Sequence, residues 1–194
     1  MNSTFEEKKL FLSRFLQLGK TISSFCPSSI ALAKATCQFI NPAIPQTIIE
    51  LGAGTGPVTR AALKKMHPDS TLIAIESDPE LGAFLQKQSD CAKAKIIIGD
   101  AGDLAEHLDK LNVKTIDVMI SGLPLPNMPE KAVKNILTVL ANKGTNPGTP
   151  FCQITIVPWV YISTYKRLFE DVQFQMVWKN MPPGGVYICR NPRN

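Results

Sequence analysis

The chain has 194 residues, a length at which a single domain buries a sizeable hydrophobic core. Apolar residues make up 44% of it and charged residues 19%, a composition that excludes an intrinsically disordered protein. The formal net charge of +5 favours polyanionic partners, either RNA or an anionic membrane surface, and does not choose between them.

The five cysteines are scattered, and no Cys-x-x-Cys pair occurs among them. This pattern indicates neither a disulfide framework nor a zinc site, so we expect no bound metal and a reducing, cytoplasmic environment. Charged residues interrupt the first 20 residues, which is not the pattern of a secretory signal. No apolar run approaches the roughly 18 residues of a membrane-spanning helix.

Residues 1–45 are expected to form an N-terminal helical segment. Apolar side chains recur at helical spacing over 5–22, with lysines on and beside the other side. One interpretation places this helix in a membrane interface, with its lysines near anionic headgroups. The other packs it on the core, where amphipathic helices usually lie. A second helix is predicted over 30–39, with Ser28 or Ser29 as its N-cap.

Residues 46–194 alternate between apolar strands and helices at a regular interval. The expected strands are 47–51, 71–76, 95–100, 115–121, 150–158, 172–180 and 185–191. The expected helices are 56–66, 78–88, 102–110, 128–141 and one near 163–170. This order predicts one α/β domain of the doubly wound type, with a parallel sheet covered on both faces. Because no helix separates the last two strands, we expect them to form an antiparallel hairpin.

The stretch "ELGAGTG" (50–56) places three glycines at alternate positions between the first strand and its helix. Glycine permits positive φ and close backbone approach, and the helix N-terminus offers free N–H groups, so this turn is typical of nucleotide binding. The spacing is Gly-x-Gly-x-Gly and not the Gly-x-Gly-x-x-Gly of dinucleotide enzymes, which argues against NAD.

Acidic residues end the first three strands, whose carboxyl ends lie side by side in a doubly wound sheet. Glu76 follows Gly56 by 20 residues, where a carboxylate accepts hydrogen bonds from ribose hydroxyls. Asp100, in "GDA", is placed to accept from an adenine amino group. Glu50 is placed to attract the cationic end of a ligand, such as an α-amino group or a sulfonium.

On these motifs, residues 46–191 resemble the class I S-adenosylmethionine-dependent methyltransferases. The resemblance implies a seven-stranded Rossmann-like sheet of order 3-2-1-4-5-7-6 with the last strand antiparallel, S-adenosylmethionine as cofactor and S-adenosylhomocysteine as product. The cofactor-binding residues that we predict are Glu50, Gly52, Ala53, Gly54, Gly56, Glu76, Ser77, Asp100, Ala101 and Ser121. Ser77 departs from the family pattern, because such enzymes usually carry a large apolar residue there against the adenine ring.

The fourth strand ends in "SGLPLPN" (121–127), where methyltransferases hold the acceptor atom. Enzymes that methylate base amines resemble one another in an Asn-Leu-Pro-Tyr type of sequence at this place. Gly122 and Leu125 replace its two base-holding side chains, which disfavours a flat aromatic acceptor. We expect carbonyls of Ser121, Gly122 or Leu123 to hold an amine.

Three aromatic residues follow the fifth strand, in "VPWVYISTY". After repeated methylation the acceptor is a cation without N–H groups, and an aromatic face attracts such a cation. Trp159, Tyr161 and Tyr165 are placed to supply one, and Tyr161 is our candidate catalytic aromatic. The alternative is that these residues belong to the core or to an interfacial belt.

Three stretches resemble the bacterial phospholipid N-methyltransferases of the ribosomal RNA adenine dimethylase-like group: "CPSSIALAKA", "SGLPLPN" and "VWKNMPPGGVYICRN". This resemblance implies methylation of the amine of phosphatidylethanolamine by a peripheral protein at the inner membrane face. The RNA dimethylases carry a helical RNA-contacting domain after the sheet, whereas this chain stops after the last strand. We therefore expect a phospholipid surface as partner in preference to nucleic acid.

Two alternatives stay open. The first is an RNA adenine N6-methyltransferase, which would bind RNA in a salt-sensitive way. The second is a non-catalytic module that binds S-adenosylmethionine or a membrane, which the replacement at Ser77 and the missing aromatic make conceivable. The sequence predicts neither the number of methyl groups added nor the oligomeric state.

Overall fold

The structure is a computed structural model of the chain, and it describes residues 29–145, 148–157, 159–180 and 183–193. The helix predicted over 5–22 lies outside the described residues, so its membrane role stays a prediction. No helix in the described ranges is long and apolar enough to span a membrane.

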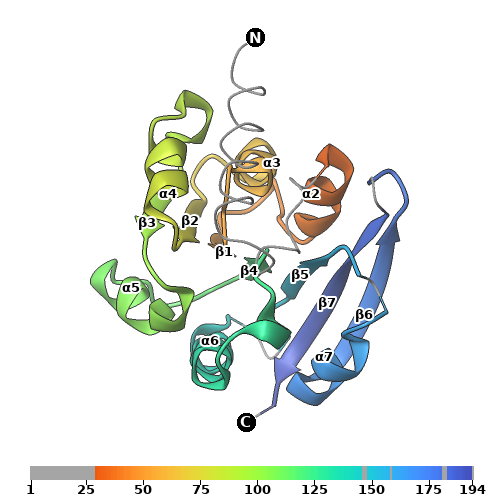
Figure 1. Cartoon of the computed structure of the whole chain (residues 1–194). Coiled ribbons are helices and arrows are strands. Elements are labelled where there is room, and N and C mark those ends of the chain that lie inside the picture. Colours follow the sequence, from red (N-terminus) through yellow and green to blue (C-terminus); the bar gives the residue numbers. More distant parts are fainter. Residues whose placement is uncertain (1–28, 146–147, 158, 181–182, 194) are drawn as a thin grey trace.

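A seven-stranded sheet forms the centre of the molecule (Figure 1). Its order is β3-β2-β1-β4-β5-β7-β6, and β7 runs antiparallel to both of its neighbours. The strands are β1 (Thr47–Leu51), β2 (Thr71–Glu76), β3 (Lys95–Ile98), β4 (Val118–Ser121), β5 (Phe151–Thr155), β6 (Phe169–Val177) and β7 (Gly184–Pro192). The predicted fold class, strand order and terminal hairpin are all confirmed.

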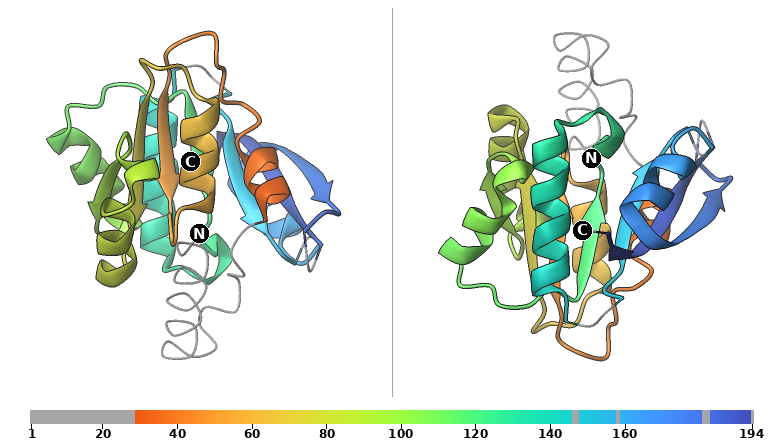
Figure 2. Two further views of the ribbon diagram at one scale, coloured as in Figure 1. Left: turned by 90° about the horizontal axis from the view of Figure 1, so that it is seen from above. Right: turned by 90° about the horizontal axis from the view of Figure 1, so that it is seen from below.

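Helices cover the two faces of the sheet (Figure 2). The helices on one face are α2 (Ile30–Thr36), α3 (Pro57–Lys65) and α4 (Pro79–Gln86), and those on the other are α5 (Leu104–Lys110), α6 (Glu130–Lys143) and α7 (Ile162–Leu168). Three short 3-10 turns add to these: η2 (Ser89–Cys91), η3 (Ala101–Asp103) and η4 (Leu125–Asn127).

Strand residues alternate between these faces, because successive side chains of a strand point to opposite sides. Ile48 packs with α2 and α3, whereas Ile49 packs with α5 and α6. Both side chains are fully buried. The near-continuous apolar strands therefore reflect a sheet that is covered on both faces.

Most element boundaries differ from the sequence prediction by one to three residues, and two of the differences have a clear physical reason. The strand β6 begins at Phe169, three residues before the predicted start, because Phe169 is fully buried and stacks on Phe151 at 5.3 Å between ring centroids. The helix α2 ends at Thr36 and not at residue 39. Just after this helix end, the Lys65 ammonium donates to the carbonyls of Cys37 and Gln38 at 2.9 and 2.8 Å. These two carbonyls therefore have a hydrogen-bond donor although the helix does not continue.

Candidate active site

The glycine turn leaves β1 with all three of its glycines at positive φ. A Cβ atom on Gly52 would lie 2.7 Å from Cδ2 of Leu123, so the missing side chain lets the loop after β4 approach the turn. A Cβ atom on Gly54 would meet nothing within 4 Å. Gly54 therefore faces open space, which a ligand can occupy.

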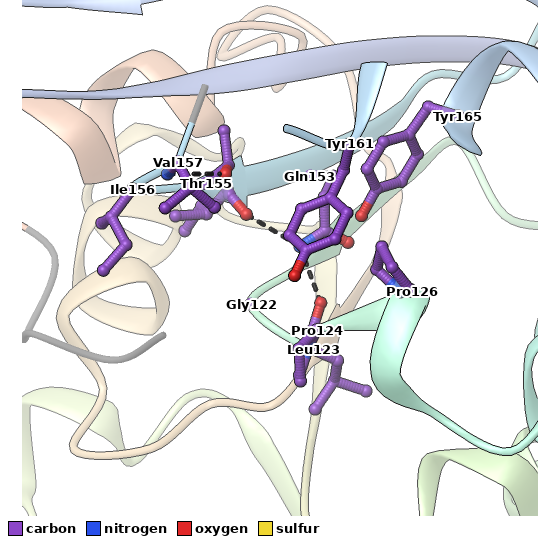
Figure 3. Close-up of a pocket in the computed structure, with 11 residues that line it drawn as sticks. Gly122, Leu123, Pro124, Pro126, Gln153, Thr155, Ile156, Val157, Tyr161 and Tyr165 are labelled. Carbon is purple, nitrogen blue, oxygen red and sulfur yellow. Dashed lines mark hydrogen bonds between the residues drawn. The ribbon is translucent and has the colours of Figure 1, made fainter. Parts of the chain in front are cut away.

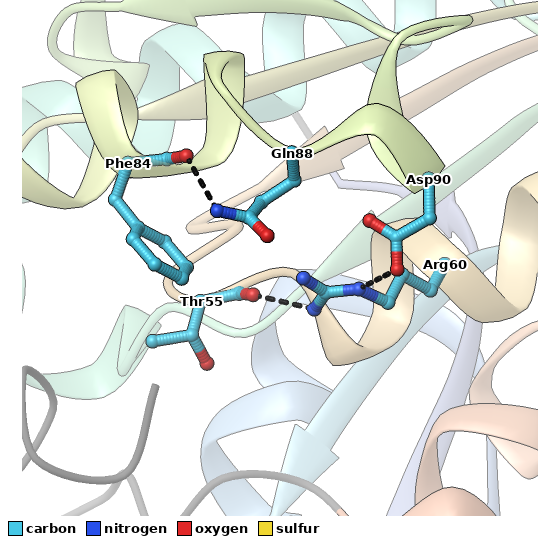
Figure 4. A network of polar contacts seen from close by, with 5 residues as sticks. All are labelled: Thr55, Arg60, Phe84, Gln88 and Asp90. Carbon is cyan, nitrogen blue, oxygen red and sulfur yellow. Dashed lines mark hydrogen bonds and ion pairs between the residues drawn. The ribbon is translucent and has the colours of Figure 1, made fainter. Parts of the chain in front are cut away.

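The back of the glycine turn is held by Arg60 of α3 (Figure 4). Its guanidinium donates to the Thr55 carbonyl at 2.7 Å and pairs with Asp90 at 2.7 Å. Asp90 belongs to η2, after α4. These contacts join the turn to the connection between α4 and β3 and hold the turn in place before any ligand binds.

Glu76, at the end of β2, is bound on both of its carboxylate oxygens. Oε2 accepts from the Gly54 N–H at 2.7 Å, and Oε1 accepts from the Asp78 N–H at 2.9 Å. Burial raises the pKa of this carboxyl, and the two backbone N–H groups act in the opposite direction. The side chain is thus fixed beside the glycine turn, where the ribose was expected.

Glu50 lies on the α3 side of β1, beneath the glycine turn. It is 2% exposed, and it accepts a hydrogen bond from the Thr59 hydroxyl at 2.7 Å. Burial raises the pKa of this carboxyl to about 8. Glu50 does not line the open cleft described next, so its attraction for a cationic ligand stays a prediction.

A cleft opens at the carboxyl ends of β1, β2 and β3. It is lined by Gly52, Ile75, Ser77, Gly99, Asp100, Ala101, Leu123, Pro124 and Met128. Four predicted cofactor residues are thus brought together here: Gly52, Ser77, Asp100 and Ala101. The other six, Glu50, Ala53, Gly54, Gly56, Glu76 and Ser121, are not among its lining residues. Sequence reasoning missed Ile75 and Met128, two apolar side chains that line the same cleft as Ser77.

Asp100 lies at the rim of this cleft and caps the turn η3. Its Oδ1 accepts from the Gly102 N–H at 2.6 Å, which holds the carboxylate at the end of β3. The His107 ring lies against the same segment, with Nε2 at 3.0 Å from the Asp100 carbonyl. This histidine contacts the backbone of the segment and is not among the residues that line the cleft.

A second cavity lies on the other side of the loop after β4 (Figure 3). It is lined by Gly122, Leu123, Pro124, Pro126, Gln153, Ile154, Thr155, Ile156, Val157, Tyr161 and Tyr165. Leu123 and Pro124 line both cavities, so the two cavities adjoin at this segment. The loop predicted to hold the acceptor therefore lies beside both the larger cleft and the smaller cavity.

The predicted amine-holding carbonyls differ in what they already bind. The Leu123 carbonyl accepts from the Gln153 amide at 2.8 Å and from the Leu125 N–H at 2.9 Å, which occupies both of its lone pairs. Ser121 is fully buried, and it pairs with Leu51 and Gln153 within the sheet. Within the described part of the chain, no hydrogen bond reaches the Gly122 carbonyl, so the prediction is best placed there.

The three aromatic candidates take different positions. Tyr165 is 2% exposed and stacks on Tyr187 at 4.6 Å between ring centroids, which is the core role we left open. Trp159 is 68% exposed. The half-buried Tyr161 directs its ring toward the Gly122–Pro124 segment (Figure 3). Tyr161 is therefore the aromatic residue that the second cavity presents to an acceptor.

No metal centre accompanies this site: the described residues contain no group of three or more histidine, cysteine and acidic side chains that could hold an ion. The four described cysteines, Cys37, Cys91, Cys152 and Cys189, are buried and free. Burial raises the pKa of Cys37 to about 12, so this thiol is protonated and inert at neutral pH.

The sheet order and the glycine-turn cleft define the class of protein, a class I S-adenosylmethionine-dependent methyltransferase fold. An O-methyltransferase from Bacillus cereus, crystallised in complex with SAH, superposes with a TM-score of 0.67 over 98% of this chain and 91% of that chain. The identity in that superposition is 12%, so it shows the fold alone. No protein-family model matches the chain.

A relative in sequence identifies the family. An ornithine lipid N-methyltransferase of Singulisphaera acidiphila is 36% identical over 182 residues, which are 93% of this chain and 94% of that protein. The chain therefore belongs to the family of this lipid N-methyltransferase. A shorter match links it to ribosomal RNA small subunit methyltransferase A of Mycoplasma pneumoniae, with 30% identity over 58% of this chain and 41% of that protein.

Proposed function

We propose that this protein transfers methyl groups from S-adenosylmethionine to the amine of a membrane-lipid headgroup. The match to a lipid N-methyltransferase over nearly the whole length of both chains carries this proposal. Two cavities that adjoin at Leu123 and Pro124 support it, because methyl transfer requires that donor and acceptor meet directly, with the reacting atoms close together.

The described residues fit S-adenosylmethionine in the larger cleft. The turn leaves open space at Gly54, and Ser77 and Asp100 offer polar groups at the rim. Ile75 and Met128 supply apolar surface where Ser77 supplies none. The bound cofactor would bring a methyl group that its sulfonium has already activated. The protein then has to position and desolvate the acceptor, and no acid or base side chain is required for the transfer itself.

The acceptor residues are suited to an aliphatic amine. Leu125, at the place of the base-stacking aromatic, is 2% exposed and packs in the core, so it offers no face to a nucleobase. The carbonyl of Gly122 is placed to accept an N–H of the amine and to stabilise the charge that develops on nitrogen. The ring of Tyr161 is placed to face the methylated cation.

An exposed apolar surface beside the second cavity supports a lipid substrate. We define the aromatic face as Ile30, Val157, Trp159, Val160 and Trp178, whose exposed fractions lie between 39% and 77%. Three segments bring it together. The Ser29 N–H donates to the side-chain oxygen of Asn180 at 3.1 Å, which joins the start of α2 to the residues after β6. Thr155 pairs with Gly185, which joins the end of β5 to the start of β7 (Figure 1).

The charge around the aromatic face suits an anionic membrane. Lys34 and Lys179 are exposed on the same segments. Residues 29–38, 156–163 and 175–186 contain no aspartate or glutamate. Tryptophan and lysine are the side chains that favour the headgroup region of a bilayer. Since Val157 belongs both to the aromatic face and to the second cavity, a lipid headgroup at this surface lies beside the acceptor site.

Phosphatidylethanolamine and ornithine lipid share the chemistry that this site recognises, a primary amine on a short aliphatic arm. The resemblance in sequence implies phosphatidylethanolamine, and the relative is named for ornithine lipid. Our proposal places the enzyme at the inner face of the membrane, attached peripherally by the aromatic face. The helix predicted over 5–22 is a further candidate anchor.

A transfer assay with labelled S-adenosylmethionine tests the proposal. The acceptors are vesicles of phosphatidylglycerol that contain phosphatidylethanolamine, ornithine lipid or neither, and small ribosomal subunits in a parallel reaction. We expect label in the lipid extract of at least one amine-containing sample. The match to an RNA methyltransferase makes RNA the second candidate acceptor. Label in RNA and in none of the lipids would replace our proposal with that one.

A further inference from the structure

Gln153 of β5 is a polar side chain in a position that the fold gives to apolar residues. It lies between Ser121 of β4 and Tyr187 of β7 in the middle of the sheet, and it is 2% exposed. A buried amide is costly unless its hydrogen-bonding groups are satisfied. Packing alone therefore does not explain why a glutamine occupies this position.

The two ends of the Gln153 amide differ. Nε2 donates to the Leu123 carbonyl at 2.8 Å and to the Ile154 carbonyl at 2.9 Å. Oε1 is buried and has no hydrogen-bond partner among the described residues. Flipping the amide would direct its oxygen at two carbonyl oxygens, so the chemistry of the neighbours sets the orientation. The unsatisfied atom is an acceptor.

Gln153 lines the second cavity, so its buried acceptor lies close to that space. In Figure 3 the amide lies behind the ring of Tyr161, and its oxygen is on the side of Tyr165 and Pro126. The cavity measures about 30 Å³, which is room for one or two water-sized groups. A small donor of hydrogen bonds, such as an aliphatic amine, matches this space.

We infer that Gln153 is an amine-binding residue, whose Oε1 accepts a hydrogen bond from an N–H group of the acceptor. The inference rests on the proposed function, which it deepens by naming the atom that recognises the substrate. The same side chain holds the Leu123 carbonyl through Nε2. Gln153 thus ties the position of the amine to the Leu123–Pro124 segment, where the second cavity adjoins the cofactor cleft.

An amine-binding role and a packing role of Gln153 predict different effects on lipid binding. An ethanolamine headgroup offers N–H donors to Oε1, whereas a quaternary choline headgroup offers none. Loss of the oxygen should therefore weaken binding of the ethanolamine lipid and leave binding of the choline lipid unchanged. A residue that only held the loop would affect both lipids to the same extent.

The test uses Gln153→Met, which keeps the length of the side chain and removes both polar ends. Binding of soluble dihexanoyl phosphatidylethanolamine and dihexanoyl phosphatidylcholine is measured by calorimetry in the presence of S-adenosylhomocysteine. We expect Gln153→Met to weaken the ethanolamine lipid about tenfold, the effect of one hydrogen bond to a buried acceptor, and to change the choline lipid less than twofold. The control is Gln173→Met, on an exposed position of β6, with no change in either.

Two further measurements, the affinity for S-adenosylhomocysteine and the melting temperature, report whether the variant is folded. If Gln153→Met does not fold, Gln153→Asn withdraws the oxygen by one methylene and should show the same selective loss. Equal weakening of both lipids, or of neither, overturns the role of Gln153 while the proposed function stands. A wild-type protein that methylates no lipid overturns the proposed function itself.

Discussion

The two halves of the site treat their polar groups differently. In the cofactor half, formed by β1 to β3, Glu76 and Asp100 already accept hydrogen bonds from backbone N–H groups. In the acceptor half, formed by β4, β5 and α7, the Gln153 oxygen is buried without a described partner. The first half is thus preorganised before ligand binds, whereas the second half holds a buried acceptor that we propose the substrate satisfies.

On our proposal, substrate specificity resides in the smaller cavity. A cofactor cleft built from a glycine turn and fixed acids suits any acceptor, and neighbours with O-methyltransferase activity share its fold. The smaller cavity carries the features that are particular to this chain, namely Gln153, Tyr161 and the adjoining aromatic face. The following predictions perturb one half at a time.

The contact between the two halves should be the most sensitive point. Gly52→Ala places a Cβ atom 2.7 Å from Leu123 and strains a residue at φ +75°. We expect kcat/KM to fall about a hundredfold, because shifts of this size misplace the reacting groups. Gly148→Ala is the matched control, since Gly148 has φ +131° and lies away from both cavities. Similar activities of the two variants would show that close approach of the loops is unimportant.

The cofactor half should respond to Glu76→Ala through cofactor affinity. The substitution leaves the Gly54 N–H and the ribose hydroxyls without their acceptor, which costs about 1–3 kcal/mol of binding free energy. Calorimetry with S-adenosylhomocysteine measures this loss, and Glu130→Ala, on an exposed position of α6, serves as the control. An affinity within twofold of the wild type would mean that the ribose binds elsewhere.

The aromatic face beside the acceptor half should contribute to binding of anionic membranes. Trp159→Ser removes the indole that is 68% exposed at the aromatic face, and we expect partitioning to anionic vesicles to fall about tenfold. Ile44→Ser changes an apolar side chain that is 51% exposed before β1, at the opposite end of the sheet, and should leave partitioning unchanged. Vesicle sedimentation compares the two. Equal losses would remove the specific role of the aromatic face.

The last prediction concerns the stability of the ligand-free protein and leaves activity aside. The pKa of Glu50 is about 8 in the folded chain and 4.5 ordinarily, so between these values the folded state holds the extra proton. The free energy of unfolding should then fall as the pH rises through this range, by at most about 1.4 kcal/mol per pH unit. Glu50→Gln should flatten the dependence in urea melts from pH 5 to 8.5. An unchanged slope would show that Glu50 is charged in the folded protein.

The cofactor half could be predicted from the sequence because its signals are local. The glycines of "ELGAGTG" follow a strand directly, and Glu76 ends the next strand, so topology alone brings them together. Asp100 followed from the same rule. Arg60 and its contact with Asp90, which fix the turn, could not be predicted, since they are 30 residues apart in the sequence and join two different connections.

The acceptor half depends on contacts between distant residues. The sequence predicted Gln153 only as part of an apolar strand. A polar residue two positions after the apolar Phe151, and so on the same face of the strand, could have marked it as unusual. Its partner Leu123 is 30 residues away. The sequence could not tell that the Leu123 carbonyl is occupied, nor that Tyr165 packs on Tyr187. The start of β6 was also set by such packing, through Phe169 on Phe151.

A crystal structure with S-adenosylhomocysteine and a soluble phosphatidylethanolamine tests the central claim most directly. We predict the thioether sulfur in the cleft beside Gly52 and the lipid nitrogen in the cavity beside Gln153, facing each other where the two cavities adjoin at Leu123 and Pro124. A nitrogen within hydrogen-bond distance of the Gln153 oxygen would agree with the account. A nucleoside bound outside the glycine-turn cleft, or a headgroup bound away from the Leu123–Pro124 segment, would contradict it.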